Sequence, residues 1–482
     1  MTPHSPDLNP ARRRLELTRS AEDEVDVLVV GGGITGAGVA LDAASRGLSV
    51  TLIEARDLAF GTSRFSSKLV HGGLRYLATG DFATARESAQ ERHLLMTAIA
   101  PHLIRSLPQL LPFVPGVTLA QRFAGAAGMS VGDVLRLQAR TSHVTLPGPR
   151  LVSARTARRM VPALNRAGLR GAMVGYDGQL IDDAKLVITV SRTAASLGAR
   201  ILTRVRAISL SARGADAEDV ITGGRLRIRA RSVINATGVW AGTLDEQIRL
   251  RPSRGTHVVL DGADLGHPNA ALTIPLPGSI SRYVFALPQW DGHVYVGLTD
   301  EDAPGPIPDV ARPTEREIAF LLDSLNRVLS TPIRRDQVRG AYAGLRPLVD
   351  SGDDSTSDIS RRHLVTESEA GFVNVLGGKL TTYRRMAQDA VDLAVRVRGL
   401  SAGPSRTASL RLVDAVVPPS DPLFDDLPLT RAGIEFAVRS EGALTADDVL
   451  DRRTRVGLVD ADRARALPMA TELMTAVLSE FD

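Results

Sequence analysis

The 482-residue sequence contains no cysteine. This absence excludes disulfides, iron–sulfur clusters, thiolate zinc sites and cysteine nucleophiles, and it fits a reducing compartment. No run of about 18 uncharged apolar residues occurs, so we expect no membrane-spanning helix. Hydrophobic residues make up 44% and charged residues 23%, as in an ordinary soluble globular protein. The length suffices for two or three domains with a large core.

Lysine is also scarce. Of 58 lysines and arginines, only Lys68, Lys185 and Lys379 are lysines. Lysine is a compact point charge and arginine a rigid fork, so a retained lysine indicates a position that needs the smaller cation. The net charge of +4 is compatible with anionic substrates or an anionic membrane surface. It is too weak to indicate nucleic-acid binding, and we predict no metal site.

A nucleotide-binding pattern stands near the start of the chain. The apolar residues 25–30 run into a G-x-G-x-x-G motif on Gly31, Gly33 and Gly36, followed by an amphipathic helix and a strand that ends on Glu54. The first glycine permits the tight turn, the second lets backbone N–H groups approach a pyrophosphate, and the third lets the helix pack closely on the strand. Glu54 is placed to accept from ribose hydroxyls. We therefore predict a dinucleotide-binding βαβ unit.

A second element resembles a flavoprotein turn. Residues 231–242, RSVINATGVWAG, read as an apolar strand that ends on Ala236, Thr237 and Gly238. This strand with its Ala-Thr-Gly ending is typical of flavoproteins with two dinucleotide folds. Read alone, the segment could equally be an ordinary strand and turn.

A third glycine turn distinguishes FAD from NAD. Residues 372–395 read as a strand, a turn at Gly377 and Gly378, and a helix that starts near Leu380. The N–H groups at the start of this helix would stabilise the negative charge that a flavin gains on reduction. An NAD dehydrogenase has no need of such a late glycine-rich helix start, so we predict FAD as the cofactor.

The predicted fold is α/β, a Rossmann-like FAD-binding fold of the glutathione-reductase and D-amino-acid-oxidase type. Its FAD-binding domain is discontinuous and is expected to consist of residues 24–98, 170–255 and 340–398. Within it we predict a capped helix over 81–98 and one strand over 200–209.

The remaining segments differ in pattern. Residues 99–169 and 256–339 are expected to form the substrate domain. Within them, residues 256–300 contain short alternating strands between Pro/Gly turns, which predict an antiparallel sheet that covers the flavin. Residues 399–482 follow a Pro/Ser-rich linker and read as a small helical C-terminal domain. Residues 1–23 carry three arginines but no apolar stretch of signal-peptide length. We expect a flexible, solvated tail there, with a contact to lipid or nucleic acid as the alternative.

The ordered motifs of the chain resemble one family, the FAD-dependent (respiratory, aerobic-type) glycerol-3-phosphate dehydrogenases. The resemblance covers most of residues 25–395 and includes SSKLVHGGLRYL, YAGLRPL, SRRHLV and GGKLTTYR in family order. This combination is not shared by flavin enzymes generally. It implies oxidation of sn-glycerol 3-phosphate to dihydroxyacetone phosphate, with hydride passing from C2 to flavin N5.

The resemblance also implies where substrate phosphate and flavin bind. The chain is expected to bend at a glycine pair so that Arg75 and Tyr76 meet the substrate phosphate, with Arg361 as a second phosphate-side arginine. The family usually has an acid where Arg362 stands, so either arginine could point inward. Beyond the first motif, the expected cofactor-binding residues are Ser66, Ser67, Lys68, His71, Gly72, Gly73, Ala236, Thr237, Gly238, Gly378, Lys379, Leu380 and Thr381.

Three residues are expected to act on the reacting atoms. Arg346 matches the arginine that would stabilise the developing alkoxide, although a bare arginine before proline could also be a surface ion pair. Lys379 is expected beside both flavin and substrate. His257 is the first candidate to accept the hydroxyl proton, because an ordinary histidine pKa lies near working pH, with a satisfied strand-edge histidine as the alternative. Leu298 and Gln289 depart from the family pattern and leave substrate positioning open.

The electron acceptor is the least determined part of the prediction. The oxidase branch of the family carries an internal insertion, and none of that size interrupts the matched segments, so we favour a membrane quinone over oxygen. Residues 103–139 are apolar with scattered arginines, as in a surface that enters a lipid interface, or else in a buried core. We expect a cytoplasmic protein attached peripherally to the inner face of the membrane, and leave a homodimer open. Another FAD oxidase, of an amine or a 2-hydroxy acid, and a non-catalytic flavoprotein are the alternatives.

Overall fold

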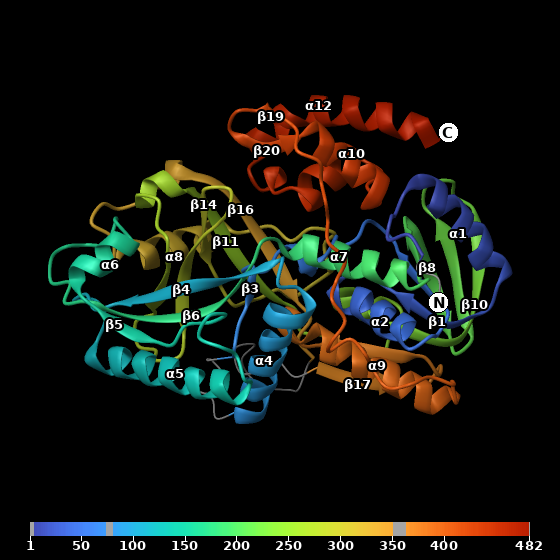
Figure 1. Ribbon diagram of the computed structural model, residues 1–482, viewed down its shortest axis with the longest axis horizontal. Helices are drawn as coiled ribbons and strands as arrows, with labels where there is room; N and C mark the ends of the chain where they lie inside the picture. The colour runs from blue at the N-terminus through green and yellow to red at the C-terminus, as the bar shows by residue number, and fades with distance from the viewer. Residues whose placement is uncertain (1–3, 74–80, 350–362, 482) are drawn as a thin grey trace.

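A mostly parallel sheet carries the glycine-rich motif at its centre. In the computed structural model, which describes residues 4–73, 81–349 and 363–481, this sheet has the strand order β17-β18-β10-β1-β2-β7 (Figure 1). The strands are β1 (Val25–Val30), β2 (Val50–Glu54), β7 (Arg200–Thr203), β10 (Arg225–Asn235), β17 (His363–Glu367) and β18 (Val373–Gly377). Within this order of described strands, only β17 runs antiparallel to its neighbour. The strand order changes direction between β1 and β10, which is where such sheets bind nucleotides.

Helices cover this sheet, and both faces of its central strand are buried. Val27, Leu28 and Val29 of β1 are fully buried. The helices are α2 (Ile34–Ser45), α7 (Asp183–Ser196) and α9 (Tyr383–Arg398), and α2 packs against both of the others. A Cβ at Gly38 of α2 would lie 2.8 Å from the Tyr383 ring, so the glycine permits the close approach of α9. The helix predicted after the third glycine turn is confirmed as α9.

A hairpin extends the sheet beyond β10. It consists of β8 (Val205–Ser211) and β9 (Gly214–Asp219). The single strand predicted over 200–209 is therefore wrong: the chain breaks at Arg204, whose φ of 59° lies in the left-handed region.

The N-terminal segment is helical, contrary to the flexible tail expected for residues 1–23. Helix α1 (Pro10–Glu22) begins with proline, and the Asn9 side chain accepts from the Arg12 N–H as its N-cap. The helix packs on β7 and β10. The buried Glu16 accepts from Arg12 Nε at 2.6 Å, so this arginine pairs within the protein instead of projecting into solvent.

A second, mostly antiparallel sheet forms the other large part of the molecule, in the order β15-β11-β14-β13-β12-β4-β6-β3, with β16 paired to β11 and β5 to β6. Its strands are β3 (Leu69–Val70), β4 (Ile104–Pro112), β5 (Arg150–Val152), β6 (Ala172–Leu180), β11 (Ser253–Asp261), β12 (Ala271–Pro275), β13 (Tyr283–Pro288), β14 (His293–Gly297), β15 (Glu301–Asp302) and β16 (Val338–Arg346). The antiparallel substrate-domain sheet predicted from the sequence is confirmed. Strands β6 and β16 belong to it although the predicted FAD-binding ranges contained them, because β16 pairs with β11 from Arg346 to Val338.

Four helices accompany this sheet: α4 (Phe82–Leu94), α5 (Leu119–Gln138), α6 (Ala154–Met160) and α8 (Glu315–Asn326). The predicted cap of α4 is confirmed, since Asp81 accepts from the Thr84 N–H at 3.2 Å. Thr118 and Gln121 form a capping box that starts α5. Residues 103–139 therefore contain strand β4 followed by the long helix α5.

The C-terminal residues form a separate helical unit with its own core. It contains β19 (Pro422–Phe424), β20 (Leu427–Thr430), α10 (Arg431–Ser440), α11 (Ala446–Asp448), a five-residue π-helical turn (Val449–Arg453) and α12 (Asp460–Leu478). Ile434, Val438 and Leu450 are fully buried in that core. Figure 1 shows the unit, in red, lying along one side of both sheets. The helical C-terminal domain predicted from the sequence is confirmed.

Candidate active site

A cavity of about 1310 Å³ is lined by residues from both sheets. Its wall includes Gly31, Gly33 and Glu54 at the carboxyl edge of the parallel sheet, and His257 and Arg346 from the second sheet. The nucleotide motif and the predicted reacting residues thus share one space.

The nucleotide end of this cavity is a cradle of close backbone contacts. Gly31 has a φ of 109°, and a Cβ there would lie 2.6 Å from the Ala236 carbonyl oxygen. A Cβ at Gly36 would overlap the Gly31 carbonyl oxygen, so helix α2 reaches the strand only because that position is glycine. The N–H groups at the start of α2 therefore lie close to the place where a pyrophosphate would bind.

The Glu54 carboxylate is held by backbone N–H groups of the glycine-rich turn and of the residues that follow β2. Its carboxylate accepts from the Gly32 N–H at 2.6 Å and from the Arg56 N–H at 2.8 Å. Desolvation raises the pKa of the Glu54 carboxyl, and the two N–H bonds oppose that rise. A carboxylate has about four acceptor sites, so the group still has capacity for ribose hydroxyls.

Ser63 is a cavity residue that the sequence reading missed. Gly33 occupies the N-cap position of α2 and has no side chain, and the Ser63 Oγ accepts from the Ile34 N–H at 2.9 Å instead. The serine lies 29 residues from its partner in sequence, so no local capping pattern could indicate it.

The two later glycine turns also face the cavity. Ala236, Thr237 and Gly238 line it at the end of β10. Gly377 and Gly378, with φ of 67° and 74°, lead from β18 into a 3₁₀ turn (Leu380–Thr382) and then α9. The described cofactor candidates that line the cavity are Gly31, Gly33, Glu54, Ser66, Ser67, His71, Ala236, Thr237, Gly238, Gly378, Lys379, Leu380 and Thr381.

Lys68 was expected to contact the cofactor, but the structure places it behind the cavity wall. Its side chain is 2% exposed and does not line the cavity. The ammonium donates to Asp183 Oδ1 and to the Arg64 carbonyl oxygen, both at 2.6 Å. Asp183 Oδ2 in turn accepts from the N–H of Ser66 at 2.9 Å and its hydroxyl at 2.7 Å. The lysine therefore fixes the segment that lines the cavity, from behind.

Gly72 and Gly73 also stand behind the cavity wall rather than in it. The Gly72 N–H donates to Asp177 Oδ1 at 3.1 Å, and Arg92 Nη1 donates to the same oxygen at 2.6 Å. A Cβ at Gly72 would overlap the Arg92 guanidinium, which explains the glycine. His71 and Asp177 line the cavity, and the Arg92–Asp177 pair was not predicted.

His257 lies in the cavity wall, but its pKa differs from the expectation. The residue is 2% exposed, its Nε2 lies 2.8 Å from Ser67 Oγ, and its ring stacks on Tyr342 with centroids 4.8 Å apart. Burial, and then the cations of Lys68 and Arg346, lower the pKa of His257 to about 3. The imidazole is therefore neutral in the physiological range, but the same burial and cations make it a weaker base than the ordinary histidine expected from the sequence.

Arg346 is fixed by three acceptors. Its Nη1 donates to Ser253 Oγ and to Asp300 Oδ1, both at 3.0 Å, and its Nη2 donates to the Thr299 carbonyl oxygen at 3.1 Å. A Cβ at Gly255 would overlap the guanidinium in its present position, so this glycine leaves room for the arginine beside strand β11. Arg346 does form an ion pair, with Asp300, but this pair lies in the cavity wall and not on an open surface.

Of the other predicted substrate-side residues, two line the cavity and three lie outside the described residues. Lys379 lines the cavity and its ammonium donates to the Ser88 hydroxyl of α4. Arg75, Tyr76 and Arg361 lie outside the described residues. Leu298 lines the cavity.

Gln289, the other departure from the family pattern, is buried elsewhere. Its amide donates to the Leu287 carbonyl oxygen and accepts from Arg455. The glutamine therefore joins the second sheet to the C-terminal domain.

Comparison with known proteins agrees with this geometry. Residues 26–384 match the FAD-dependent oxidoreductase family, and residues 405–480 match the C-terminal domain of alpha-glycerophosphate oxidase. Glycerol-3-phosphate dehydrogenase 1 of Mycobacterium tuberculosis (strain H37Rv) is 49% identical over 98% of this chain and 100% of its own length. This chain belongs to the FAD-dependent glycerol-3-phosphate dehydrogenase family.

Solved structures show the same fold. The glycerol-3-phosphate dehydrogenase from Bacillus halodurans, complexed with FAD, superposes with a TM-score of 0.72 at 23% identity, over 98% of this chain and 96% of that one. The L-alpha-glycerophosphate oxidase from Mycoplasma pneumoniae, with FAD bound, superposes with a TM-score of 0.60 at 18% identity, over 82% of this chain and all of that one.

FAD is the cofactor of this dehydrogenase family, and the residues present fit it. The close-packed glycines at one end and the turn at Gly377 and Gly378 at the other provide N–H groups for a pyrophosphate and for the pyrimidine edge of a flavin. FAD supplies the two-electron acceptor on which the chemistry depends.

Proposed function

We propose that this protein oxidises sn-glycerol 3-phosphate to dihydroxyacetone phosphate, with the C2 hydrogen leaving as hydride to N5 of FAD. The observation that carries the proposal is that a neutral His257 and a fixed Arg346 line the same cavity as the nucleotide cradle. The 49% identity with a mycobacterial glycerol-3-phosphate dehydrogenase supports the choice of substrate.

Side chains of this protein are proposed to stabilise the developing charge, to accept the proton and to bind the phosphate. The Arg346 guanidinium, already held in place, stabilises the negative charge that develops on the C2 oxygen without reorganising during the reaction. His257 remains the proposed acceptor of the hydroxyl proton because its neutral ring lies in the wall of the same cavity as Arg346, although its lowered pKa makes it a weak base before substrate binds. Arg75, Tyr76 and Arg361 remain the proposed phosphate-side contacts, and Lys379 is proposed to lie beside both the flavin and the substrate.

An anaerobic titration tests the substrate. We expect glycerol 3-phosphate to bleach the flavin absorption band of the purified holoenzyme, whereas glycerol and glycine leave it unchanged. The comparison with glycerol measures the requirement for the phosphate, and glycine tests the alternative of an amine oxidase. An unchanged band with glycerol 3-phosphate, or equal bleaching by glycine, would falsify the proposed substrate.

We also propose a membrane quinone as the electron acceptor, with oxygen as the alternative. Helix α5 supports this choice, because it carries an exposed apolar stripe at helical spacing. The exposed side chains are Leu119, Phe123, Val131, Val134 and Leu137, between 41% and 74% exposed. This face supports the lipid-interface alternative for the second half of residues 103–139, because β4 is mostly buried whereas α5 presents apolar side chains to solvent.

Helix α5 is suited to a shallow contact with one leaflet of a membrane. Within the described ranges, whose gaps are residues 1–3, 74–80, 350–362 and 482, no helix is long and apolar enough to cross a membrane. An amphipathic helix lying in the interface, aided by arginines such as the neighbouring Arg140, attaches a protein peripherally. Attachment at the inner face of the cytoplasmic membrane would bring the flavin site near the quinone pool.

Replacing two stripe residues should weaken membrane binding. We expect Phe123→Ser with Leu137→Ser to lower the partition onto vesicles containing anionic lipid at least about tenfold, because each side chain contributes about 1.5–3 kcal/mol when buried. Co-sedimentation measures the partition, and glycerol 3-phosphate oxidation with a soluble dye should stay unchanged. Val416→Ser, at a residue 78% exposed in the linker to the C-terminal domain, is the matched control. Equal partition of both variants would exclude α5 as the contact.

A further inference from the structure

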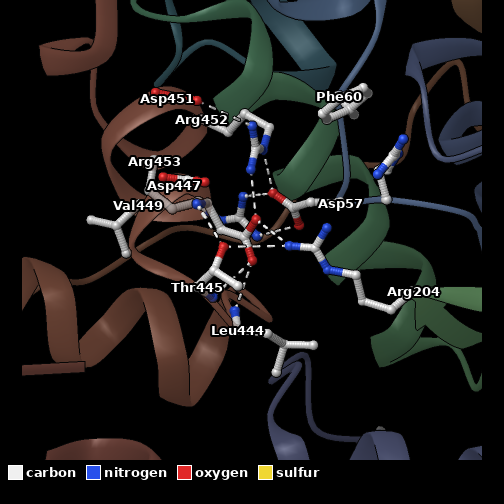
Figure 2. Close-up of polar contacts among 12 residues, drawn as sticks. Asp57, Phe60, Arg204, Leu444, Thr445, Asp447, Val449, Asp451, Arg452 and Arg453 are labelled. Carbon is white, nitrogen blue, oxygen red and sulfur yellow. Dashed lines mark hydrogen bonds and ion pairs between the residues drawn. The ribbon is translucent and has the colours of Figure 1, made fainter. Parts of the chain in front are cut away.

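A buried ion-pair cluster joins the C-terminal domain to the cofactor-binding domain. Asp57, which follows the β2 strand and Glu54, is 1% exposed. Its Oδ2 accepts from Arg452 Nε at 2.6 Å and from Arg453 Nη1 at 2.5 Å, and its Oδ1 accepts from Arg453 Nη2 at 2.9 Å. Figure 2 shows both guanidiniums of the π-helical turn converging on this one carboxylate.

The two arginines keep the Asp57 carboxyl group ionised. Burial alone would raise the pKa of Asp57, but Arg453 and Arg452 outweigh it and lower the pKa to about 2. Both arginine side chains are at most 3% exposed. A buried carboxylate with two buried guanidiniums is stable only while all three are in contact, since losing one partner leaves an uncompensated charge.

Asp448 extends the cluster to a second part of the cofactor-binding domain. Its Oδ1 accepts from Arg452 Nη2 at 2.6 Å and from Arg204 Nη2 at 2.7 Å, and its Oδ2 accepts from the Leu444 and Thr445 N–H groups. The Arg204 N–H donates to the Arg56 carbonyl oxygen, so Arg204 holds the residue directly before Asp57.

The segment held in this way is the one that lines the cavity. We call residues 55–67 the cofactor loop; its cavity-lining members include Arg56, Phe60, Thr62, Ser63 and Ser66. Its regular structure is limited to one 3₁₀ turn (Thr62–Arg64). A loop with so little backbone hydrogen bonding of its own takes its shape from its tertiary contacts.

Two further contacts reach the same loop from the C-terminal domain. The Phe60 ring lies in the cavity wall with the Arg452 guanidinium 5.7 Å from its centroid, and Arg64 pairs with Asp451 at 3.5 Å. At the far end of the loop, Arg455 pairs with Asp182 at 2.8 Å, next to the Asp183 that binds Ser66.

We propose that Arg452 and Arg453 are positioning residues for FAD, through which the C-terminal domain holds the cofactor loop in its FAD-binding shape by way of Asp57. Linkage is reciprocal: if docking of this domain favours FAD binding, then bound FAD favours docking by the same factor. The C-terminal domain is therefore part of the cofactor site although it does not line the cavity among the described residues. The inference depends on FAD as cofactor and not on the identity of the substrate.

Titration of apoprotein with FAD tests the proposal. We expect Arg453→Met to raise the Kd for FAD at least about tenfold, and Asp57→Asn to do the same. Arg465→Met is the matched control, because Arg465 pairs with Asp426 on the exposed surface of the same domain. Its Kd should stay within about twofold of wild type. A wild-type Kd in Arg453→Met, with the variant folded, would overturn the proposal.

Hydrogen exchange of the wild-type protein is a second test, which needs no variant. We expect FAD to slow amide exchange in residues 444–455, whereas residues 465–478 of α12 show the same exchange with and without it. In Asp57→Asn this long-range protection should disappear while the glycine cradle is still protected. Exchange in 444–455 that does not respond to FAD in the wild-type protein would also overturn the proposal, whether or not the variants fold.

Discussion

Arg346→Ala should lower kcat by about two orders of magnitude or more while leaving FAD bound. The guanidinium is preorganised by Ser253, Asp300 and the Thr299 carbonyl. Its charge is needed mainly when the C2 oxygen becomes negative, so the loss falls on the transition state more than on substrate binding. Steady-state kinetics with glycerol 3-phosphate, together with the flavin absorption spectrum, measures both effects.

The control is Arg251→Ala, which removes an exposed pair with Asp302 near the same strand. Such a pair contributes little, so this variant should keep wild-type kcat within about twofold. Arg346→Lys should recover part of the lost rate, because it restores the charge without the paired N–H geometry. If Arg346→Ala raises KM alone, the residue binds substrate and does not stabilise the transition state.

The FAD-binding fold was predictable because its determinants are local. Gly31 directly follows β1, Gly36 lies in the first turn of α2, and Gly377 and Gly378 stand at the end of β18. A Cβ at Gly31, Gly36 or Gly378 would overlap another part of the chain. Backbone constraints of this kind leave a direct trace in sequence as glycine at fixed spacing.

The errors concern contacts between distant segments. Arg13 of the supposed tail pairs with Asp219, which lies 206 residues away at the end of β9, and no local pattern connects the two. Strand β16 lies mostly within a range expected for the FAD-binding domain but pairs with β11 of the second sheet, whose residues lie up to 93 positions earlier in the chain. Periodicity identifies a strand but does not identify its partner.

At the site, position was predictable and electrostatics was not. The family resemblance indicated His257, but the low pKa of this residue results from burial and from Lys68 and Arg346, which are separated from it by 189 and 89 positions. The scarcity of lysine indicated that Lys68 and Lys379 matter. It could not indicate that Lys68 lies behind the cavity wall, where a buried acid needs a small cation.

Lys68→Met should destabilise the folded holoenzyme by about 3–5 kcal/mol, the largest stability effect we expect from one substitution. Burial lowers the pKa of Lys68 and the Asp183 carboxylate opposes that shift, so the two groups depend on each other for charge compensation. Methionine keeps the length of the side chain but leaves Asp183, itself fully buried, without its cation. Because Asp183 also holds Ser66, the loss should loosen the cavity wall and release FAD at a lower temperature.

Lys185→Met is the matched control, since Lys185 lies two residues after Asp183 on the same helix and is only half-buried. It should change the free energy of unfolding by less than about 0.5 kcal/mol. Adding Asp183→Asn to Lys68→Met removes the orphaned charge while an amide oxygen can still accept from Ser66, so the double variant should be more stable than Lys68→Met alone. Thermal unfolding followed by flavin fluorescence, at fixed FAD concentration, ranks the four proteins. If the double variant is less stable than the single one, the lysine contributes by packing and not by neutralising Asp183.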